Sequence, residues 1–231
     1  MNAGIVGVLF IIATVAGTIA ASIGNPILDA PDYLTKISAN EGTIIIGTFL
    51  VFLMAISCAG IGLGLYPIMR KYSVGMAIGV VGFRVIEGMI DILGGVSTIA
   101  LLALSQEFVK AGAPDVAFFQ TIGAIIKARD EWLSNGVMLL CWCIGAFMYY
   151  TLFYQHRLVP RWLSGWGLVG ITLTTISSVL VMFHIIPGFG TVQVVANLPI
   201  ALQEMVFAVW LIAKGVNPSA VAARTAKVNV N

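Results

Sequence analysis

The sequence predicts an all-α fold, an integral membrane bundle of six transmembrane helices. The chain is 59% hydrophobic and only 10% charged over its 231 residues, whereas soluble domains are about 25% charged. Apolar windows of about 20 residues, the length that crosses the hydrocarbon core of a bilayer, recur six times and leave only short connections. We therefore expect a single transmembrane domain over residues 1–231 and no separate soluble domain.

The apolar windows give the expected helices in order. They cover residues 4–23, 43–66, 74–104, 133–154, 162–186 and 195–214. No basic residue precedes the first window, so we interpret it as a retained helix and not as a cleaved signal peptide. The third window is longer than one crossing needs, and either Gly94-Gly95 breaks it or the helix tilts. Pro199 lies inside the sixth window, near its outer end, and is expected to kink that helix.

The connection that precedes the fourth window is the longest, at residues 106–131. Its later part carries apolar residues at helical spacing, namely Phe119, Ile122 and Ile126. This period is typical of an amphipathic helix with one apolar face. We therefore expect a short outer interfacial helix that runs into the fourth window.

Lysine and arginine are distributed unequally between the two sides of the predicted bundle. The connections after the second and fourth windows and the C-terminal tail carry basic residues and no acidic one, namely Arg70, Lys71, Arg157, Arg161, Lys214, Arg224 and Lys227. The alternate connections carry fewer basic residues, namely Lys36, Lys110, Lys127 and Arg129, together with seven acidic residues. The positive-inside rule then predicts that both termini are cytoplasmic. The net charge of +2 gives no reason to expect a nucleic-acid partner, and the expected partner is the lipid bilayer.

Ionisable residues also lie deep inside two of the windows. Arg84 is ten residues above the inner end of the third window, or roughly 15 Å, and Glu87 and Asp91 follow it on the same helix face. Glu204 is nine residues in from the outer end of the sixth window, so it reaches a similar depth from the opposite direction. A charge at mid-bilayer costs roughly 3 kcal/mol or more, so such residues usually face the bundle interior and find partners. We therefore expect Arg84 to contact Glu204, Glu87 or both.

Two amides extend this polar set on the sixth window. Asn197 shares the helix face of Glu204, and Gln203 is its neighbour in sequence. If the third and sixth helices face each other, a polar column runs from mid-membrane toward the outer surface, formed by Arg84, Glu87, Asp91, Asn197, Gln203 and Glu204. Three interpretations remain open for it: a structural ion cluster that fixes helix register, a pocket for a ligand or an ion, and a catalytic site.

The other reactive side chains suggest no further site. Cys58, Cys141 and Cys143 lie within apolar windows and are interpreted as core thiols, so we expect neither a disulfide nor a metal site. His156 and His184 fall at opposite membrane faces, which argues against a haem held by two histidines. No GxSxG, P-loop or HExxH motif occurs. The sequence therefore identifies no catalytic residue and no cofactor.

Three stretches resemble a known family. They are YPIMRKYSVGMAIGVVGFRVIEG at 66–88, RLVPRWLSGWGLVG at 157–170 and LPIALQEMVFAVWLIAKG at 198–215. With their spacing, they resemble a family of bacterial membrane proteins, domain of unknown function DUF4386, over nearly the whole chain. The family pattern falls on Arg84, Glu87 and Glu204, and less clearly on Gln203 and Arg129-Asp130. The resemblance supports the architecture and the choice of residues only, and it implies no activity. We expect a multi-pass protein of the bacterial cytoplasmic (inner) membrane.

The sequence supports one functional hypothesis and two alternatives. The first is a charged pocket between the third and sixth helices that opens outward and binds a small molecule or an ion, in a transporter-like or sensory protein. The first alternative is an accessory structural subunit that packs on another membrane protein in a larger complex. The second alternative is an intramembrane enzyme, which lacks a recognisable nucleophile or metal motif in the sequence.

The charge distribution yields a topology prediction. Single cysteines placed at Asp32 or Asp115, in a chain whose own three cysteines are replaced, should react with a membrane-impermeant maleimide added to intact cells. A cysteine at Arg157 should react only after the membrane is opened, because the basic loops are expected to be cytoplasmic. Reaction of the Arg157 probe in intact cells would refute this orientation.

Overall fold

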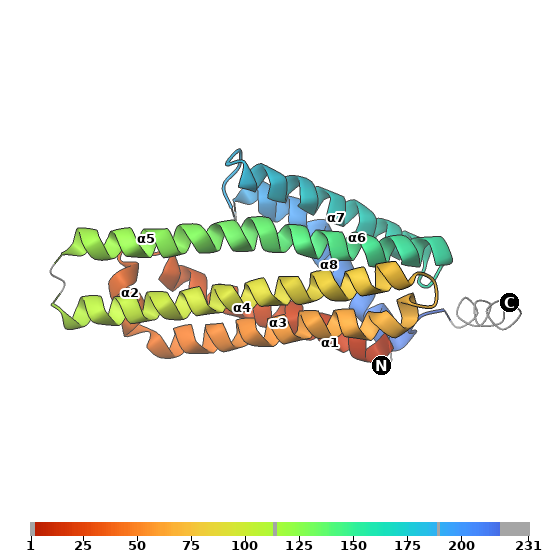
Figure 1. Cartoon of the computed structure of the whole chain (residues 1–231), viewed down its shortest axis with the longest axis horizontal. Coiled ribbons are helices and arrows are strands. Elements are labelled where there is room, and N and C mark those ends of the chain that lie inside the picture. Colours follow the sequence, from red (N-terminus) through yellow and green to blue (C-terminus); the bar gives the residue numbers. More distant parts are fainter. Residues whose placement is uncertain (1–2, 113–114, 189, 218–231) are drawn as a thin grey trace, which may run out of the picture.

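A computed structural model of the protein describes residues 3–112, 115–188 and 190–217, and every regular element within them is helical (Figure 1). The elements are α1 (Ala3–Leu28), α2 (Tyr33–Ala39), α3 (Glu41–Met69), α4 (Val74–Lys110), α5 (Val116–Trp132), the π-helical segment η1 (Leu133–Met138), α6 (Leu139–His156), α7 (Arg161–Met182) and α8 (Thr191–Ala213). The basic residues Arg224 and Lys227 of the predicted cytoplasmic tail lie outside the described residues.

Six helices are long and apolar enough to cross a bilayer. They are α1, α3, α4, the continuous helix made by α5, η1 and α6, and then α7 and α8. The prediction of an all-α chain with six membrane-length helices is therefore confirmed. The start of α1 and the end of α8 lie at the same end of the bundle (Figure 1), as an even number of crossings requires. Which side of a membrane that end faces stays a prediction.

Two of the six long helices, of 37 and 41 residues, are much longer than the roughly 20 residues that one bilayer crossing needs. α4 runs without a break for 37 residues, roughly 55 Å at 1.5 Å per residue. Gly94-Gly95 does not break it, because a helical glycine costs only about 1 kcal/mol relative to alanine and neighbours pack on this pair. A Cβ on Gly94 would lie 3.2 Å from an Asp130 carboxylate oxygen, and one on Gly95 would lie 3.3 Å from Thr48.

The short helix expected before the fourth crossing is present as α5. It is not separate from that crossing, however, because η1 joins it to α6 in one helix of 41 residues, Val116–His156. Together α4 and α5 extend the bundle at the end away from the two termini (Figure 1). A location of α5 at the membrane interface stays a prediction.

The six long helices form a closed ring. Each contacts the next in the order α1, α3, α4, α6, α7 and α8, and α8 closes on α1. In this order α4 stands opposite α8, and α1 stands opposite α6. The third and sixth spanning helices therefore face each other across the ring, and side chains have to bridge the distance between them.

Aromatic side chains fill the centre of the ring. Phe10 of α1 meets Phe207 of α8 edge to face, with ring centroids 5.5 Å apart. Tyr149 and Tyr150 of α6 pack on the same Phe207. Phe153, one turn further along α6, completes the group, with its ring centroid 5.8 Å from that of Phe207. These large buried aromatic rings exclude lipid and water from the centre of the bundle. Charged side chains of α4 and α8 extend into that centre.

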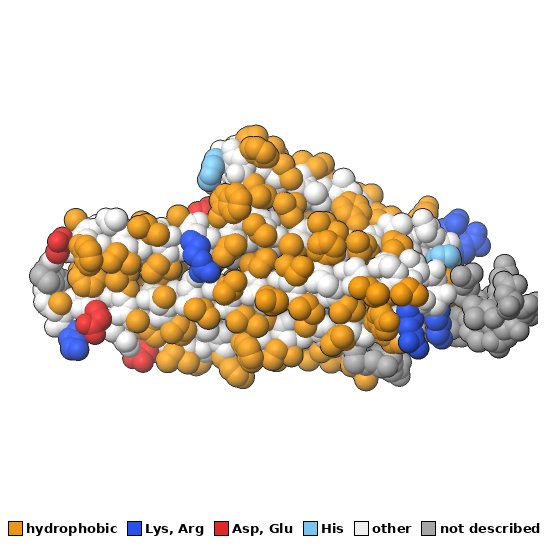
Figure 2. Space-filling model, viewed as in Figure 1, with side chains coloured by type: hydrophobic (Ala, Val, Ile, Leu, Met, Phe, Trp, Pro, Cys, Tyr) orange, Lys and Arg blue, Asp and Glu red, His pale blue; other side chains and the backbone are white. Residues whose placement is uncertain are grey.

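Hydrophobic side chains cover much of the visible face (Figure 2), and each of the six long helices has exposed large hydrophobic side chains. Most charged side chains in this view lie toward the two ends of the bundle, and at the end near the N-terminus the visible ones are Lys and Arg without Asp or Glu. This surface is apolar along its flanks and polar at its ends, which fits a protein surrounded by lipid.

Glycine allows two of the neighbouring helices to approach closely. A Cβ on Gly88 of α4 would lie 2.7 Å from the backbone oxygen of Ala55 on α3. A Cβ on Gly82, in the same helix, would meet nothing within 4 Å. Small residues at such contacts let membrane helices pack backbone to backbone.

This contrast predicts opposite outcomes for two matched substitutions. Gly88→Ala should separate α3 from α4 and destabilise the protein by about 1–3 kcal/mol, the usual cost of overpacking. Gly82→Ala should be neutral or slightly stabilising, because alanine is the better helix former. Thermal unfolding of both variants in the same detergent measures the difference, and equal melting temperatures would contradict the packing of α3 on α4.

Candidate functional site: a buried charged cluster

Arg84 lies at the centre of the ring and pairs with carboxylates from two helices. Its Nη1 donates to both carboxylate oxygens of Glu87, at 3.1 and 3.2 Å. Its Nη2 lies 3.6 Å from Oε1 of Glu204 on α8. Arg84 is only 2% exposed. The expectation that Arg84 contacts Glu87, Glu204 or both is confirmed, and both contacts are made.

Tyr149 of α6 joins the two sides of this ion pair. Its hydroxyl accepts a hydrogen bond from Arg84 Nη2 at 3.2 Å and donates one to Glu204 Oε1 at 3.4 Å. The guanidinium also lies over the rings of Phe10 and Tyr149, with 5.3 and 5.6 Å between its carbon and the ring centroids. A cation over an aromatic face is stabilised most where water is excluded. Tyr149 and Phe10 could not be predicted from the sequence, because only the closed ring of six helices brings α1 and α6 to Arg84.

The two amides of the predicted column have partners outside the charged cluster. Gln203 accepts from Tyr150 Oη at 2.5 Å and donates to the backbone oxygen of Leu163 at 2.9 Å. Asn197 accepts from Ser177 Oγ at 3.3 Å. These bonds tie α8 to α6 and α7. No described hydrogen bond connects either amide to Arg84 or its carboxylates, so both have the partners expected of residues that fix helix packing.

Asp91 is the carboxylate without a partner. It follows Glu87 by one turn of α4 and is 7% exposed. Among the described residues it makes no hydrogen bond and no ion pair. A buried ionised carboxylate without a partner is strongly unfavourable, so this position calls for a proton or a cation that the described side chains do not supply.

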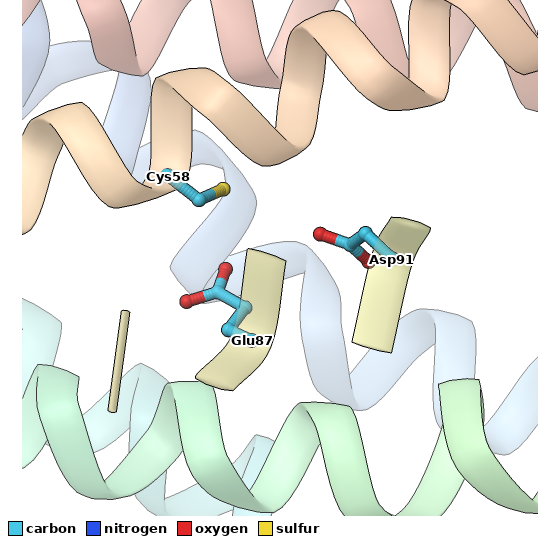
Figure 3. A group of neighbouring side chains, drawn as sticks. All are labelled: Cys58, Glu87 and Asp91. Carbon is cyan, nitrogen blue, oxygen red and sulfur yellow. The ribbon is translucent and has the colours of Figure 1, made fainter. Parts of the chain in front are cut away.

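Cys58 of α3 lies against the two carboxylates of α4. The side chains of Cys58, Glu87 and Asp91 point into the space between the helices (Figure 3), and their potential ligand atoms lie within 4.8 Å of one another. All three residues are buried. The sequence interpretation treated Cys58 as a core thiol, because nothing in its own helix marks it. Its relation to the acidic residues arises only from the packing of α3 on α4.

Polar contacts continue along α4 toward its C-terminal end. Ser97 accepts a hydrogen bond from Arg129 Nη1, and Asp130 lies beside Gly94. Nearby, the buried residues Asn135, Thr174 and Ser178 each hold a polar atom without a hydrogen-bond partner. Asn135 belongs to η1, and π-helical segments inside long helices occur often at functional sites. Arg129 and Asp130 thus lie beside the C-terminal half of α4, on a different helix from Asp91.

Two surface pockets lie away from the charged cluster. One of these lies where α6, α7 and α8 end or begin, and it includes Arg157, Arg161 and Lys214. The other is an apolar groove between α3 and α4, lined by residues such as Phe49 and Ile92. Neither includes a residue of the charged cluster. An outward-opening pocket between α4 and α8 therefore stays a prediction.

Comparison with known proteins identifies one family. The family model described as domain of unknown function (DUF4386) matches residues 5–215, which includes the whole charged cluster. No curated protein and no solved structure matches the chain. The family match covers nearly all of the described helices and supplies no activity or ligand.

The ion pairs of Arg84 predict a large effect of its removal. Arg84→Ala leaves the carboxylates of Glu87 and Glu204 buried without their cation and should destabilise the protein by about 3–5 kcal/mol. Lys110→Ala, on the same helix, removes a pair with Glu107 in which both side chains are largely exposed and should leave the melting temperature unchanged. Thermal unfolding in detergent compares the two. If Arg84→Ala fails to fold, Arg84→Lys should give an intermediate melting temperature. Lysine keeps the positive charge but lacks the planar guanidinium that donates to several partners at once. Similar melting temperatures for Lys110→Ala and Arg84→Ala would contradict the pairing.

Proposed function

The chain belongs to the DUF4386 family, and from its buried cluster we propose that it is a multi-pass membrane protein that binds a cation between α3, α4 and α8, in a transporter-like or sensory role. The bound species is either a metal ion or protons. In this proposal both termini lie in the cytoplasm, as the distribution of lysine and arginine predicts, and the C-terminal end of α4 lies on the opposite side of the membrane.

The charge balance of the cluster carries this proposal. Three carboxyl groups, those of Glu87, Asp91 and Glu204, share the single guanidinium of Arg84 among the described residues of the ring centre. Arg84 compensates one negative charge, so ionisation of all three carboxyl groups leaves two in excess. Excess charge in a dry interior is neutralised by protons or by a bound cation. An uptake of positive charge is thus the chemistry that this arrangement favours.

Packing favours an ion over a larger molecule. Arg84, Glu87 and Asp91 are between 2% and 7% exposed, and the rings of Phe10, Tyr149 and Phe207 fill the space beside them. A small organic ligand would have to displace these side chains, whereas an ion needs only its coordinating atoms. The same packing disfavours an intramembrane enzyme, which would need space for a substrate beside the reactive groups.

The side chain of Cys58 favours a transition metal as the cation. A thiolate together with carboxylate oxygens suits Zn²⁺ and similar divalent ions better than Mg²⁺ or Ca²⁺, which prefer oxygen ligands alone. Both carboxylate oxygens of Asp91 are available to such an ion. Glu87 accepts hydrogen bonds from Arg84, on the side of the site away from Asp91. Metal binding would deprotonate the thiol of Cys58. The alternative, protons alone, requires no contribution from Cys58.

A structural role is the second candidate. Gln203 and Asn197 have satisfied hydrogen bonds that tie α8 to its neighbours, and Arg84 joins α4 to α6 and α8. A cluster that only fixes helix register, in an accessory subunit of a larger membrane complex, would need these contacts and no bound ion. The two candidates differ in whether a cation stabilises the protein.

Metal titration distinguishes them. Zn²⁺ should raise the melting temperature of the purified full chain in neutral detergent, since a ligand at 100 times its Kd stabilises the folded state by about 2.7 kcal/mol. The shift should be lost in Asp91→Asn and Cys58→Ser and reduced in Glu204→Gln, because each change removes a ligand or a negative charge. Cys143→Ser, which replaces a buried thiol outside the cluster, should keep the shift.

Co²⁺ provides a readout that does not depend on stability. A sulfur-to-cobalt absorption band should appear with the wild type and with Cys143→Ser, and should be absent with Cys58→Ser. If no metal stabilises the protein, the proton form of the proposal predicts that the melting temperature depends on pH less steeply in Asp91→Asn than in the wild type. Absence of both effects would favour the structural role.

A further inference from the structure

A second site lies away from the charged cluster, at the end of the bundle where α6 ends, α7 begins and α8 ends. A cavity of about 560 Å³ opens there. Arg157 and Arg161 line it from the α6–α7 connection, and Lys214 and Trp210 line it from the end of α8. This volume lies within the range of small-molecule pockets, which is about 300–1,000 Å³.

The lining of this cavity is positively charged, and no described residue compensates that charge. Arg157, Arg161 and Lys214 form no ion pair with any described residue. No acidic residue is among the lining residues. Arg70 and Lys71 add positive charge at the same end of the bundle, in the connection between α3 and α4. Cations gathered around a cavity without a carboxylate raise the local concentration of anions.

The backbone adds to this positive potential. α7 begins at Arg161, with Pro160 as its N-cap, and no side chain caps its first N–H groups. Pro160 and Arg161 both line the cavity. The N-terminus of a helix carries a partial positive charge and free N–H donors, so it favours a phosphate or carboxylate. Three side-chain cations and one helix end therefore meet at a single cavity.

Contacts fix the backbone at Arg157, and Lys214 packs on an aromatic ring. Arg157 has a left-handed backbone, with φ of 54°, which is unfavourable for a residue with a side chain. Asn217 holds this turn, because its backbone N–H donates to Leu158 O at 2.8 Å and its Nδ2 donates to Arg157 O at 3.4 Å. Lys214 lies 4.7 Å from the ring centroid of Trp210. Strained residues that the surroundings hold in place occur often at ligand sites.

The neighbouring surface is typical of a membrane boundary. Trp162, in the first turn of α7, is 57% exposed, and its ring stacks on Trp166 with centroids 6.4 Å apart. Tryptophan is enriched where headgroups meet the hydrocarbon core. The cavity is thus at the depth at which lipid phosphates lie, and a tetrahedral phosphate suits arginine and lysine donors around it.

We infer that this cavity binds a phosphate group, carried either by the headgroup of an anionic phospholipid or by a free phosphate compound in solution. The site is distinct from the cation site of the ring centre and does not depend on it. Arg161 and Lys214 donate to the phosphate oxygens from α7 and α8, and Arg157 closes the third side.

The test uses the purified full chain in neutral detergent and measures binding of dioleoyl phosphatidylglycerol by native mass spectrometry and by the shift in melting temperature. Phosphatidylcholine is the lipid control, because its choline neutralises the same phosphate. The wild type should bind phosphatidylglycerol in preference. Arg161→Gln with Lys214→Gln should weaken this binding by about 25-fold, at about fivefold for each cation near a lipid surface.

Arg70→Gln with Lys71→Gln is the matched control, because it removes two cations from the same end without touching the cavity, and it should keep the binding. If the first double variant does not fold, Lys214→Gln alone should show a loss of about fivefold. Inorganic phosphate and glycerol phosphate are titrated in parallel by calorimetry. Binding of these, competing with the lipid, would assign the site to a free phosphate compound, and binding of the lipid alone would assign it to the headgroup. Equal binding of phosphatidylcholine, equal loss in both double variants, or no binding of any phosphate probe would overturn the inference.

Discussion

The guanidinium of Arg84 is the contact on which the centre of this protein depends. It is buried at 2% exposure and meets groups from four helices: Glu87 on its own helix α4, Tyr149 on α6, Glu204 on α8 and the ring of Phe10 on α1. A lone cation in such a place would be very unfavourable, and removal of a partner leaves a charge that nothing solvates. The closed ring of helices brings these partners to Arg84, and only its Nε is left without a hydrogen-bond partner among the described residues.

The same residue limits what the cluster can do. Nη1 and Nη2 of Arg84 are engaged by Glu87, Glu204 and Tyr149. Its buried Nε has no hydrogen-bond partner among the described residues, so the guanidinium has one donor left for an incoming anion. Asp91 makes no hydrogen bond and no ion pair with the described residues, and it lies one turn further along α4, beside the thiol of Cys58. The chemistry of the centre is thus that of an acidic site with a fixed cation at its inner end. Such a site attracts positive charge and excludes a ligand that is itself negative.

Charge has a different character at the two ends of the bundle. At the end where α1 begins and α8 ends, the described segments that connect or follow the helices contain Arg70, Lys71, Arg157, Arg161 and Lys214 and no aspartate or glutamate. At the other end, basic and acidic residues alternate and form pairs, such as Lys36 with Asp32 and Lys110 with Glu107. The first end suits an anionic membrane surface, and the second can remain exposed to water without a strong net field.

The sequence by itself determined the class of the fold and the depth of the charged residues. Apolar windows of membrane length and the spacing of Arg84, Glu87 and Asp91 depend only on helix geometry, which is local, so six membrane-length helices and the pairing of Arg84 could be predicted. The windows also underestimated two helices. α4 continues to Lys110, and α5 joins α6 through η1, because helices outside the apolar windows are stabilised by packing on neighbours and not by hydropathy.

Only the tertiary structure decided which side chains from other helices complete the site. Tyr149, Phe10 and Cys58 reach Arg84 or Asp91 through the order in which the helices close the ring, and no period in the sequence encodes that order. Gln203 bonds to α6 and α7, because a residue next to Glu204 in the chain points to a different side of the helix. Asn197 shares the face of Glu204, but it lies seven residues away along α8, where its partner is Ser177 of α7. The cavity at Arg157, Arg161 and Lys214 likewise depends on the turn that brings the end of α8 against the start of α7. Helix periodicity is a property of one segment, whereas a site is made where several segments meet.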